Sequence, residues 1–137
     1  MKGKIYRWGP VALWMGLIFF LSSQSKLPAI PGLDKIDYSD KIEHAVAYGV
    51  LGFLTWRALS ITALKWQQII ITIGIAAIYG LSDETHQLFV PGRTFDLLDL
   101  GADTLGAAIA VIALTIHMGG DKYGGRTDSN GQEKSQP

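Results

Sequence analysis

The chain contains no cysteine, and this absence excludes several kinds of chemistry. Without a thiol there can be no disulfide framework, no cysteine nucleophile and no thiolate-ligated metal site. Charge is also scarce, because Asp, Glu, Lys and Arg make up 18% of the 137 residues, against roughly 25% in soluble proteins. Twelve basic residues balance twelve acidic ones, so no basic surface predicts a nucleic-acid partner. The composition argues against an ordinary soluble domain.

The sequence is instead rich in long apolar runs. A bilayer core of about 30 Å requires about 20 apolar residues in helical form. Four segments approach this length: 8–24, 42–59, 68–90 and 97–118. The first follows three cations but lacks a small-residue cleavage site, so we expect a retained helix and not a signal peptide. We therefore predict an all-α polytopic membrane protein, a bundle of four transmembrane helices.

The domain organisation predicted from the sequence is simple. Residues 1–118 are expected to form one membrane domain. Residues 119–137 are rich in glycine, carry scattered charges and show no apolar periodicity, so we expect a disordered polar tail. Pro91 and Gly92 end the helical pattern between the third and fourth spans.

Basic residues near the spans predict the orientation in the membrane. The positive-inside rule compares Lys and Arg in the short flanking segments of each side. One side holds Lys2, Lys4, Arg7, Arg57 and Lys65, with further cations in the tail; the other holds Lys26, Lys35, Lys41 and Arg93. This bias places both termini in the cytoplasm.

Polar residues recur at helical spacing within three of the predicted spans, so they stack along helix faces. The three faces are Asp40-His44-Tyr48, Asp83-Glu84-Gln87 and Asp96-Asp99-Asp103. With the predicted topology, all three lie at the outer end of the bundle. Ionisable groups within spans are costly, face the bundle interior or water, and often mark function. The pattern therefore predicts a shared polar pocket near the outer face.

Simpler structural interpretations remain open for several of these residues. Asp40 and Asp96 each lie at a helix start, where a carboxylate caps free N–H groups. In the simpler interpretation of His44, its imidazole is an interhelical hydrogen-bond donor with no further role. Arg93 either pairs with Asp96 or Asp99, or contacts an anionic ligand.

Three segments carry a family resemblance. They are Phe-Leu-Ser-Ser-Gln at 20–24, Asp-Lys-Ile-Glu-His at 40–44, and Ser-Asp-Glu-Thr-His-Gln-Leu-Phe-Val-Pro-Gly-Arg at 82–93, followed by Asp99, Asp103 and Gly106. With these motifs the chain resembles the VanZ-like family of bacterial membrane proteins over about residues 10–115. It departs at Asp103, where the family frequently has Asn, and at Ala110, where Gly is common. The resemblance implies a multi-pass protein of the bacterial cytoplasmic membrane and an association with teicoplanin resistance.

The candidate ligand-binding site combines the polar side chains of these faces and motifs. Its members are Glu84 and Asp99 as central acceptors, His44 as a proton-dependent donor or ligand, Gln87 as a neutral hydrogen-bonding group and Arg93 as an anion contact, with Asp40 and Asp103 as secondary members.

Three functions are compatible with such a site. The first is binding or modulation of a cell-envelope component, and it requires no catalytic geometry. Its ligand would be an anionic lipid or a lipid-linked cell-wall intermediate. Arg suits phosphate because its guanidinium can donate paired hydrogen bonds. The second is a metal-dependent hydrolase or transferase acting on a lipid-linked substrate. The third is an ion-coupled transporter. The sequence leaves catalysis, any cofactor or metal, and the oligomeric state open.

Overall fold

Four α-helices make up the secondary structure of the part of the chain that the structure describes, residues 2–25, 39–59 and 65–120 of a computed structural model. They are α1 (Lys2–Ser22), α2 (Ser39–Leu59), α3 (Lys65–Gln87) and α4 (Leu97–Gly120), and these residues contain no strand. The predicted all-α class is confirmed. We predicted a disordered tail over residues 119–137. From residue 121 onwards this tail lies outside the described residues, so the prediction stays untested there.

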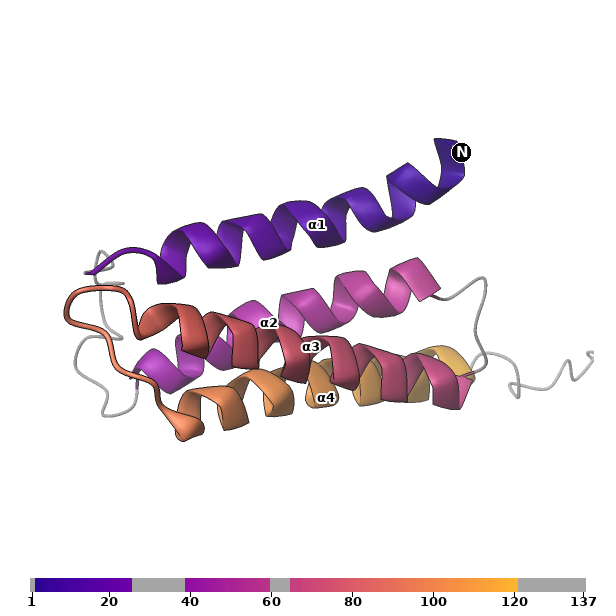
Figure 1. The fold of residues 1–137 in the computed structure, drawn as a ribbon. Helices are drawn as coiled ribbons and strands as arrows, with labels where there is room; N and C mark the ends of the chain where they lie inside the picture. Colours follow the sequence, from indigo (N-terminus) through magenta and orange to yellow (C-terminus); the bar gives the residue numbers. More distant parts are fainter. Residues whose placement is uncertain (1, 26–38, 60–64, 121–137) are drawn as a thin grey trace, which may run out of the picture.

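The helices run alternately up and down. As a result, the end of α1, the start of α2, the end of α3 and the start of α4 meet at one end of the bundle (Figure 1, left). We call this the polar end, because the three predicted polar faces lie there. The opposite end holds the start of α1 and the end of α2, where the Arg7 guanidinium donates to the Ala58 carbonyl at 2.5 Å.

The closest helix packing is between α2 and α4, and small residues permit it. A Cβ at Gly106 would lie only 2.1 Å from the Ala45 carbonyl oxygen, and one at Gly52 would lie 3.0 Å from the Ala107 Cα. Small residues allow such close backbone approach in membrane helices. A second glycine of α4, Gly101, has open space around it.

Helix α1 lies alongside α2 and α3, joined to them by individual hydrogen bonds. The Trp14 indole N–H donates to the Ala47 carbonyl at 2.8 Å, and the Tyr79 hydroxyl donates to the Met15 carbonyl at 2.5 Å. At the polar end, the Ser22 hydroxyl donates to Asp83 Oδ1 at 2.5 Å. These directional contacts fix α1 beside a more tightly packed group of three helices (Figure 1).

Compared with a soluble protein, this bundle buries many polar side chains and exposes many large apolar ones. Fully or nearly buried side chains include Thr55, Thr72, Glu84, Gln87 and Asp103. Large apolar side chains, by contrast, are exposed on every helix: among them are Leu13, Phe20, Val46, Phe53, Ile70, Ile78, Ile109 and Ile116. Soluble monomers rarely expose apolar surface on this scale.

Two of the described helices are long and apolar enough to cross a membrane, through the segments Gly3–Ser22 and Leu97–His117. Helices α2 and α3 are not among them, and both carry charged residues near their ends: Asp40, Lys41, Glu43 and Arg57 in α2, and Lys65, Asp83 and Glu84 in α3. The structure thus supports membrane-spanning character for α1 and α4. The four-span bundle stays a prediction.

Candidate functional site

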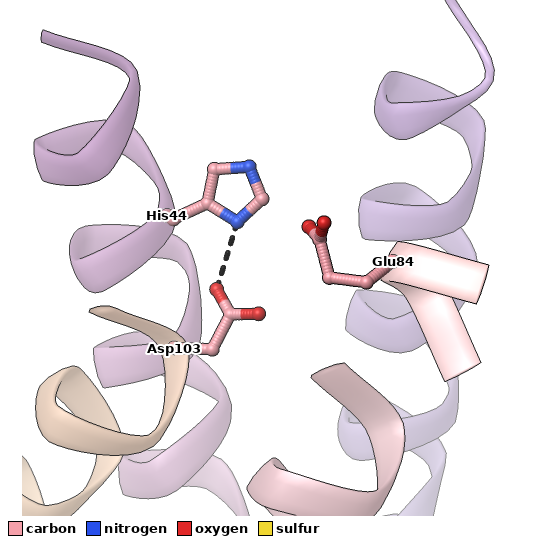
Figure 2. A group of neighbouring side chains, drawn as sticks. All are labelled: His44, Glu84 and Asp103. Carbon is pink, nitrogen blue, oxygen red and sulfur yellow. Dashed lines mark hydrogen bonds and ion pairs between the residues drawn. The ribbon is translucent and has the colours of Figure 1, made fainter. Parts of the chain in front are cut away.

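Three side chains from three helices meet inside the polar end. His44 of α2 and Asp103 of α4 lie 2.8 Å apart, Nδ1 to Oδ1, and Glu84 of α3 faces them (Figure 2). One ligand atom from each residue lies within 4.8 Å of the other two. Glu84 and Asp103 have no solvent exposure. We call these three side chains the His44–Glu84–Asp103 cluster. Helical spacing in the sequence predicted the helix face on which each of them lies.

Glu84 also accepts a hydrogen bond from the backbone at the start of α4. The backbone N–H of Asp96 donates to Glu84 Oε2 at 2.8 Å, and the Gln87 side-chain amide donates to Glu84 Oε1 at 3.3 Å. The first of these bonds satisfies a backbone donor just before α4 begins. Gln87 is 2% exposed, so this predicted site residue belongs to the buried network and orients Glu84.

Lys41 forms ion pairs with three carboxylates at the polar end of the bundle. Its ammonium lies 2.8 Å from Asp40 Oδ2, 2.6 Å from Asp96 Oδ2 and 2.6 Å from Asp99 Oδ1. Partial burial lowers the pKa of Lys41, but the hydrogen bonds that its ammonium donates to Asp40, Asp96 and Asp99 raise it by more, so the net shift is upward. The same ammonium, by hydrogen bonding, holds the pKa of Asp40 and that of Asp96 below their usual range.

This Lys41 network changes the interpretation of two predicted site residues, Asp40 and Asp99, and also involves Asp96. Asp40 is an exposed partner of Lys41, at the rim of the site. Asp96 is a helix cap, because its Oδ1 accepts the Leu98 N–H at 2.8 Å and its carbonyl accepts from Asp99 N. Asp99, expected to be a central acceptor, is neutralised by an internal cation. Sequence reasoning assigned Lys41 no role, since nothing in the spacing shows which helix it reaches.

Arg93 is carried on a tight turn between α3 and α4. The Arg93 N–H donates to the Val90 carbonyl at 3.1 Å, and Gly92 between them has a φ of 81°. These features define a type II turn, whose third residue requires a positive φ and therefore favours glycine. The Arg93 Nε donates to the Gln24 carbonyl at 3.3 Å. Among the described residues Arg93 makes no ion pair, so of its two open interpretations the pairing with Asp96 or Asp99 is not formed.

A cavity of about 500 Å³ opens between α1, α2 and α3. Its walls are mostly apolar, and Trp14, Ile18, Leu21 and Val46 contribute to them. At the polar end it reaches a different set of side chains: Asp40, His44, Tyr48, Asp83, Gln87 and Arg93. Two polar atoms of this set are buried without a hydrogen-bond partner, the Tyr48 hydroxyl and Asp83 Oδ2.

Further polar contacts at this end were not foreseen from the sequence. Ser23 Oγ lies 3.0 Å from His86 Nε2, and the His86 ring lies 4.3 Å from the Phe19 ring, centroid to centroid. Together with the bond from Ser22 to Asp83, these contacts join the end of α1 to the end of α3. The Ser-Ser-Gln run at 22–24 was the available signal, but its partners depend on how α1 packs.

The chemistry available here follows from these groups. Buried carboxylates beside an imidazole can hold a cation or exchange protons, while a guanidinium without a carboxylate partner can bind an anion in a paired geometry. Both kinds of group lie at one end of an apolar cavity. The arrangement therefore suits an amphipathic ligand better than a small polar one.

Comparison with known proteins gives one match. A protein-family model described as VanZ/LLP1 matches residues 8–117, which include most of α1 and the whole of α2 and α3, together with α4 as far as His117. No curated protein and no solved structure matches the chain. The matched region contains every residue of the candidate site.

Proposed function

Because the chain belongs to the VanZ/LLP1 family, we propose that it is a multi-pass protein of the bacterial cytoplasmic membrane that binds an anionic lipid in the cavity beside α1. The lipid's chain lies against the apolar wall, and its phosphate meets Arg93. The cavity with a guanidinium at its polar end is the observation that carries this proposal.

All four helices span the membrane in this proposal. The exposed faces of α2 and α3 support it, because the large apolar side chains of Phe53, Ile70 and Ile78 are exposed. In water such a surface would be costly, at roughly 25 cal/mol per Å² of apolar area. The charged residues that reduce the hydropathy of α2 and α3 lie near helix ends, where they reach the membrane surface or the bundle interior.

The orientation in this proposal has both termini in the cytoplasm and the polar end at the outer face. The cations Lys2, Lys4, Arg7, Arg57 and Lys65 support it through the positive-inside rule. The start of α1 and the end of α2 share one end of the bundle, as the bond from Arg7 to Ala58 requires. A reporter enzyme active only outside the cell is expected to be silent when fused after Gly120; activity there would reverse the orientation.

The guanidinium of Arg93 is the feature of the cavity that supports an anionic head group. Asp40, Glu43 and Asp83 also line the cavity, but Asp40 is paired with Lys41 and Asp83 accepts a hydrogen bond from Ser22. The guanidinium of Arg93 has no carboxylate partner among the described residues, and a charge-assisted hydrogen bond stabilises a complex by about 1.5 to 3 kcal/mol. The unpartnered Tyr48 hydroxyl offers a further hydrogen bond to a ligand oxygen.

The proposal is tested by native mass spectrometry of the detergent-purified chain. We expect more phosphatidylglycerol than phosphatidylcholine to remain bound, and we expect Arg93→Gln to reduce this preference by about tenfold, the factor that corresponds to 1.4 kcal/mol. Lys65→Gln is the matched control, since Lys65 is an exposed cation at the opposite end of the bundle. Equal retention of the two lipids by the wild type would refute the proposal.

The source of the phosphate is distinguished by a third lipid in the same assay. A polyprenyl phosphate, the class of carrier used for lipid-linked cell-wall intermediates, is compared with phosphatidylglycerol at equal concentration. Stronger retention of the polyprenyl phosphate assigns the protein to cell-wall lipids. Stronger retention of phosphatidylglycerol assigns it to bulk membrane lipid.

In this proposal, teicoplanin tolerance is a consequence of altered envelope lipid at the outer face. Expression in a susceptible Gram-positive host is expected to raise the inhibitory concentration of teicoplanin, and Arg93→Gln to remove the increase. Lys65→Gln is again the control. An increase that survives Arg93→Gln would separate tolerance from anion binding.

A further inference from the structure

The His44–Glu84–Asp103 cluster contains more negative charge than its surroundings compensate. Glu84 and Asp103 are both fully buried, and the effective cost of burying an unpaired carboxylate is several kcal/mol. Lys41 is a cation of the polar end, but its ammonium lies against Asp40, Asp96 and Asp99. Even a protonated His44 would balance only one of the two carboxylates. The cluster therefore has the electrostatic character of a cation site.

One oxygen of the cluster has no partner at all. Asp103 Oδ2 is buried and accepts no hydrogen bond, whereas Oδ1 of the same group faces His44. It is directed to the side on which Glu84 lies (Figure 2). Gly80, one turn before Glu84 on α3, leaves this oxygen its space, because a Cβ there would lie 2.8 Å from it. A buried carboxylate oxygen without a donor is rare and requires an explanation.

The distances suit a metal ion after an adjustment of the side chains. Imidazole nitrogen and carboxylate oxygen lie about 2.0 to 2.2 Å from a bound Zn²⁺, so the ligand atoms of a tetrahedral site are roughly 3.4 Å apart. The three ligand atoms here lie within 4.8 Å of one another, and His44 Nδ1 and Asp103 Oδ1 are 2.8 Å apart. A movement of about 1 Å by the side-chain atoms brings them to the separation that the ion requires. Glu84 uses one lone pair on each oxygen for Gln87 and Asp96, and a carboxylate has about four such positions.

We propose that His44, Glu84 and Asp103 bind one divalent transition-metal ion, of the Zn²⁺ or Mn²⁺ class, between α2, α3 and α4. Imidazole nitrogen combined with carboxylate oxygen favours such ions over Ca²⁺ or Mg²⁺. Three protein ligands leave at least one coordination position for water or a ligand oxygen. His44 also lines the cavity between α1 and α2, so the ion lies next to the proposed lipid site. This inference goes beyond the proposed function and does not rest on it.

The experiment measures metal on the full-length chain in detergent, after removal of any affinity tag and of adventitious metal with a chelator. Following equilibrium dialysis against Zn²⁺ and against Mn²⁺, elemental analysis is expected to find about one equivalent per chain of at least one of them. Loss of a second-shell partner alone weakens metal binding by about 10- to 100-fold, so Glu84→Gln and Asp103→Asn are expected to reduce the affinity by at least that factor.

Two controls separate the site from general metal binding. Glu43→Gln removes a carboxylate beside His44 on the same helix, and His117→Gln removes an exposed imidazole near the far end of α4. Both are expected to retain the wild-type stoichiometry. Circular dichroism checks that each variant is helical; where a variant unfolds, His44→Gln replaces it.

A second measurement does not require any variant. Metal that binds the folded state raises the unfolding temperature, by an amount that grows with its concentration. The wild type is therefore expected to be stabilised by the same ion that dialysis detects. Less than about a tenth of an equivalent bound to the wild type, or binding that persists in Glu84→Gln and Asp103→Asn alike, would overturn the proposal. Neither result bears on lipid retention, so the two proposals fail separately.

Discussion

His44 of α2 and Asp103 of α4 lie 2.8 Å apart inside the bundle, and the bond between them links the helices that pack most closely. Removing one partner of a buried pair leaves the other without compensation, which costs about 3 to 5 kcal/mol. We expect His44→Ala to destabilise the protein by that amount. We expect the double variant His44→Ala/Asp103→Ala to recover part of the loss. Unfolding in a detergent titration, followed by circular dichroism, measures both; additive effects would show that the pair is not coupled.

The packing of α2 against α4 depends on a glycine that the structure leaves no room to enlarge. A Cβ at Gly106 would lie 2.1 Å from the Ala45 carbonyl oxygen, a backbone atom that can move only with its helix. We expect Gly106→Ala to cost about 1 to 3 kcal/mol through overpacking.

Gly101 provides the matched control for Gly106, because it lies on the same helix with open space around it. We expect Gly101→Ala to leave stability unchanged or to raise it by up to about 1 kcal/mol, the helix-propensity difference between Gly and Ala. Unfolding temperatures of the two variants decide the matter. Equal losses at both positions would mean that α4 does not pack against α2 as described.

Gly92 fixes the position of Arg93 through its φ of 81°. An alanine in this left-handed region costs about 1 to 2 kcal/mol, and the turn can relax by displacing the guanidinium. We expect Gly92→Ala to weaken retention of anionic lipid, and Gly92→Asn to weaken it less, because Asn tolerates positive φ. Native mass spectrometry of the two variants provides the comparison. If both retain lipid as the wild type does, the turn has no part in positioning Arg93.

The Lys41 network predicts a pH dependence of stability. The pKa values of Asp40 and Asp96 are lowered in the folded state, so their contribution is present above the ordinary carboxyl pKa and is lost as the pH falls through the lowered values. Lys41 remains charged throughout this range. We expect the difference in unfolding temperature between wild type and Lys41→Met to shrink as the pH falls from about 6 to about 3.

Lys65→Met serves as the control for that titration, since Lys65 lies at the other end of the bundle. Its unfolding temperature is expected to differ from that of the wild type by an amount that does not change with pH. A constant difference for Lys41→Met as well would remove the basis for the network.

Much of this arrangement could be predicted from periodicity alone. Spacings of three and four residues placed Glu84, Gln87 and Asp103 on helix faces, and alternating helices brought those faces to one end. The all-α class followed in the same way. The family match over residues 8–117 agrees with the resemblance carried by the motifs.

The partners of long side chains could not be predicted, because they depend on how the helices are rotated and tilted. Lys41 reaches Asp96 and Asp99, the two carboxylates that were possible partners of Arg93. The bond from the Asp96 N–H to Glu84 depends on the path of the turn after α3. The cavity lies between α1, α2 and α3, and the partners that hold α1 there, such as Ala47 and Asp83, could not be read from the residues of α1.

The central claim, that a lipid with an anionic head group occupies the cavity, is tested most directly through Trp14, which lines it. A single-tryptophan chain, with Trp8, Trp56 and Trp66 replaced by Phe, is titrated in detergent with lipids brominated along the chain. The account predicts saturable quenching of Trp14 at lower concentrations of anionic than of zwitterionic lipid, with the difference abolished by Arg93→Gln. Quenching that is the same for both head groups, or unchanged by Arg93→Gln, would contradict it.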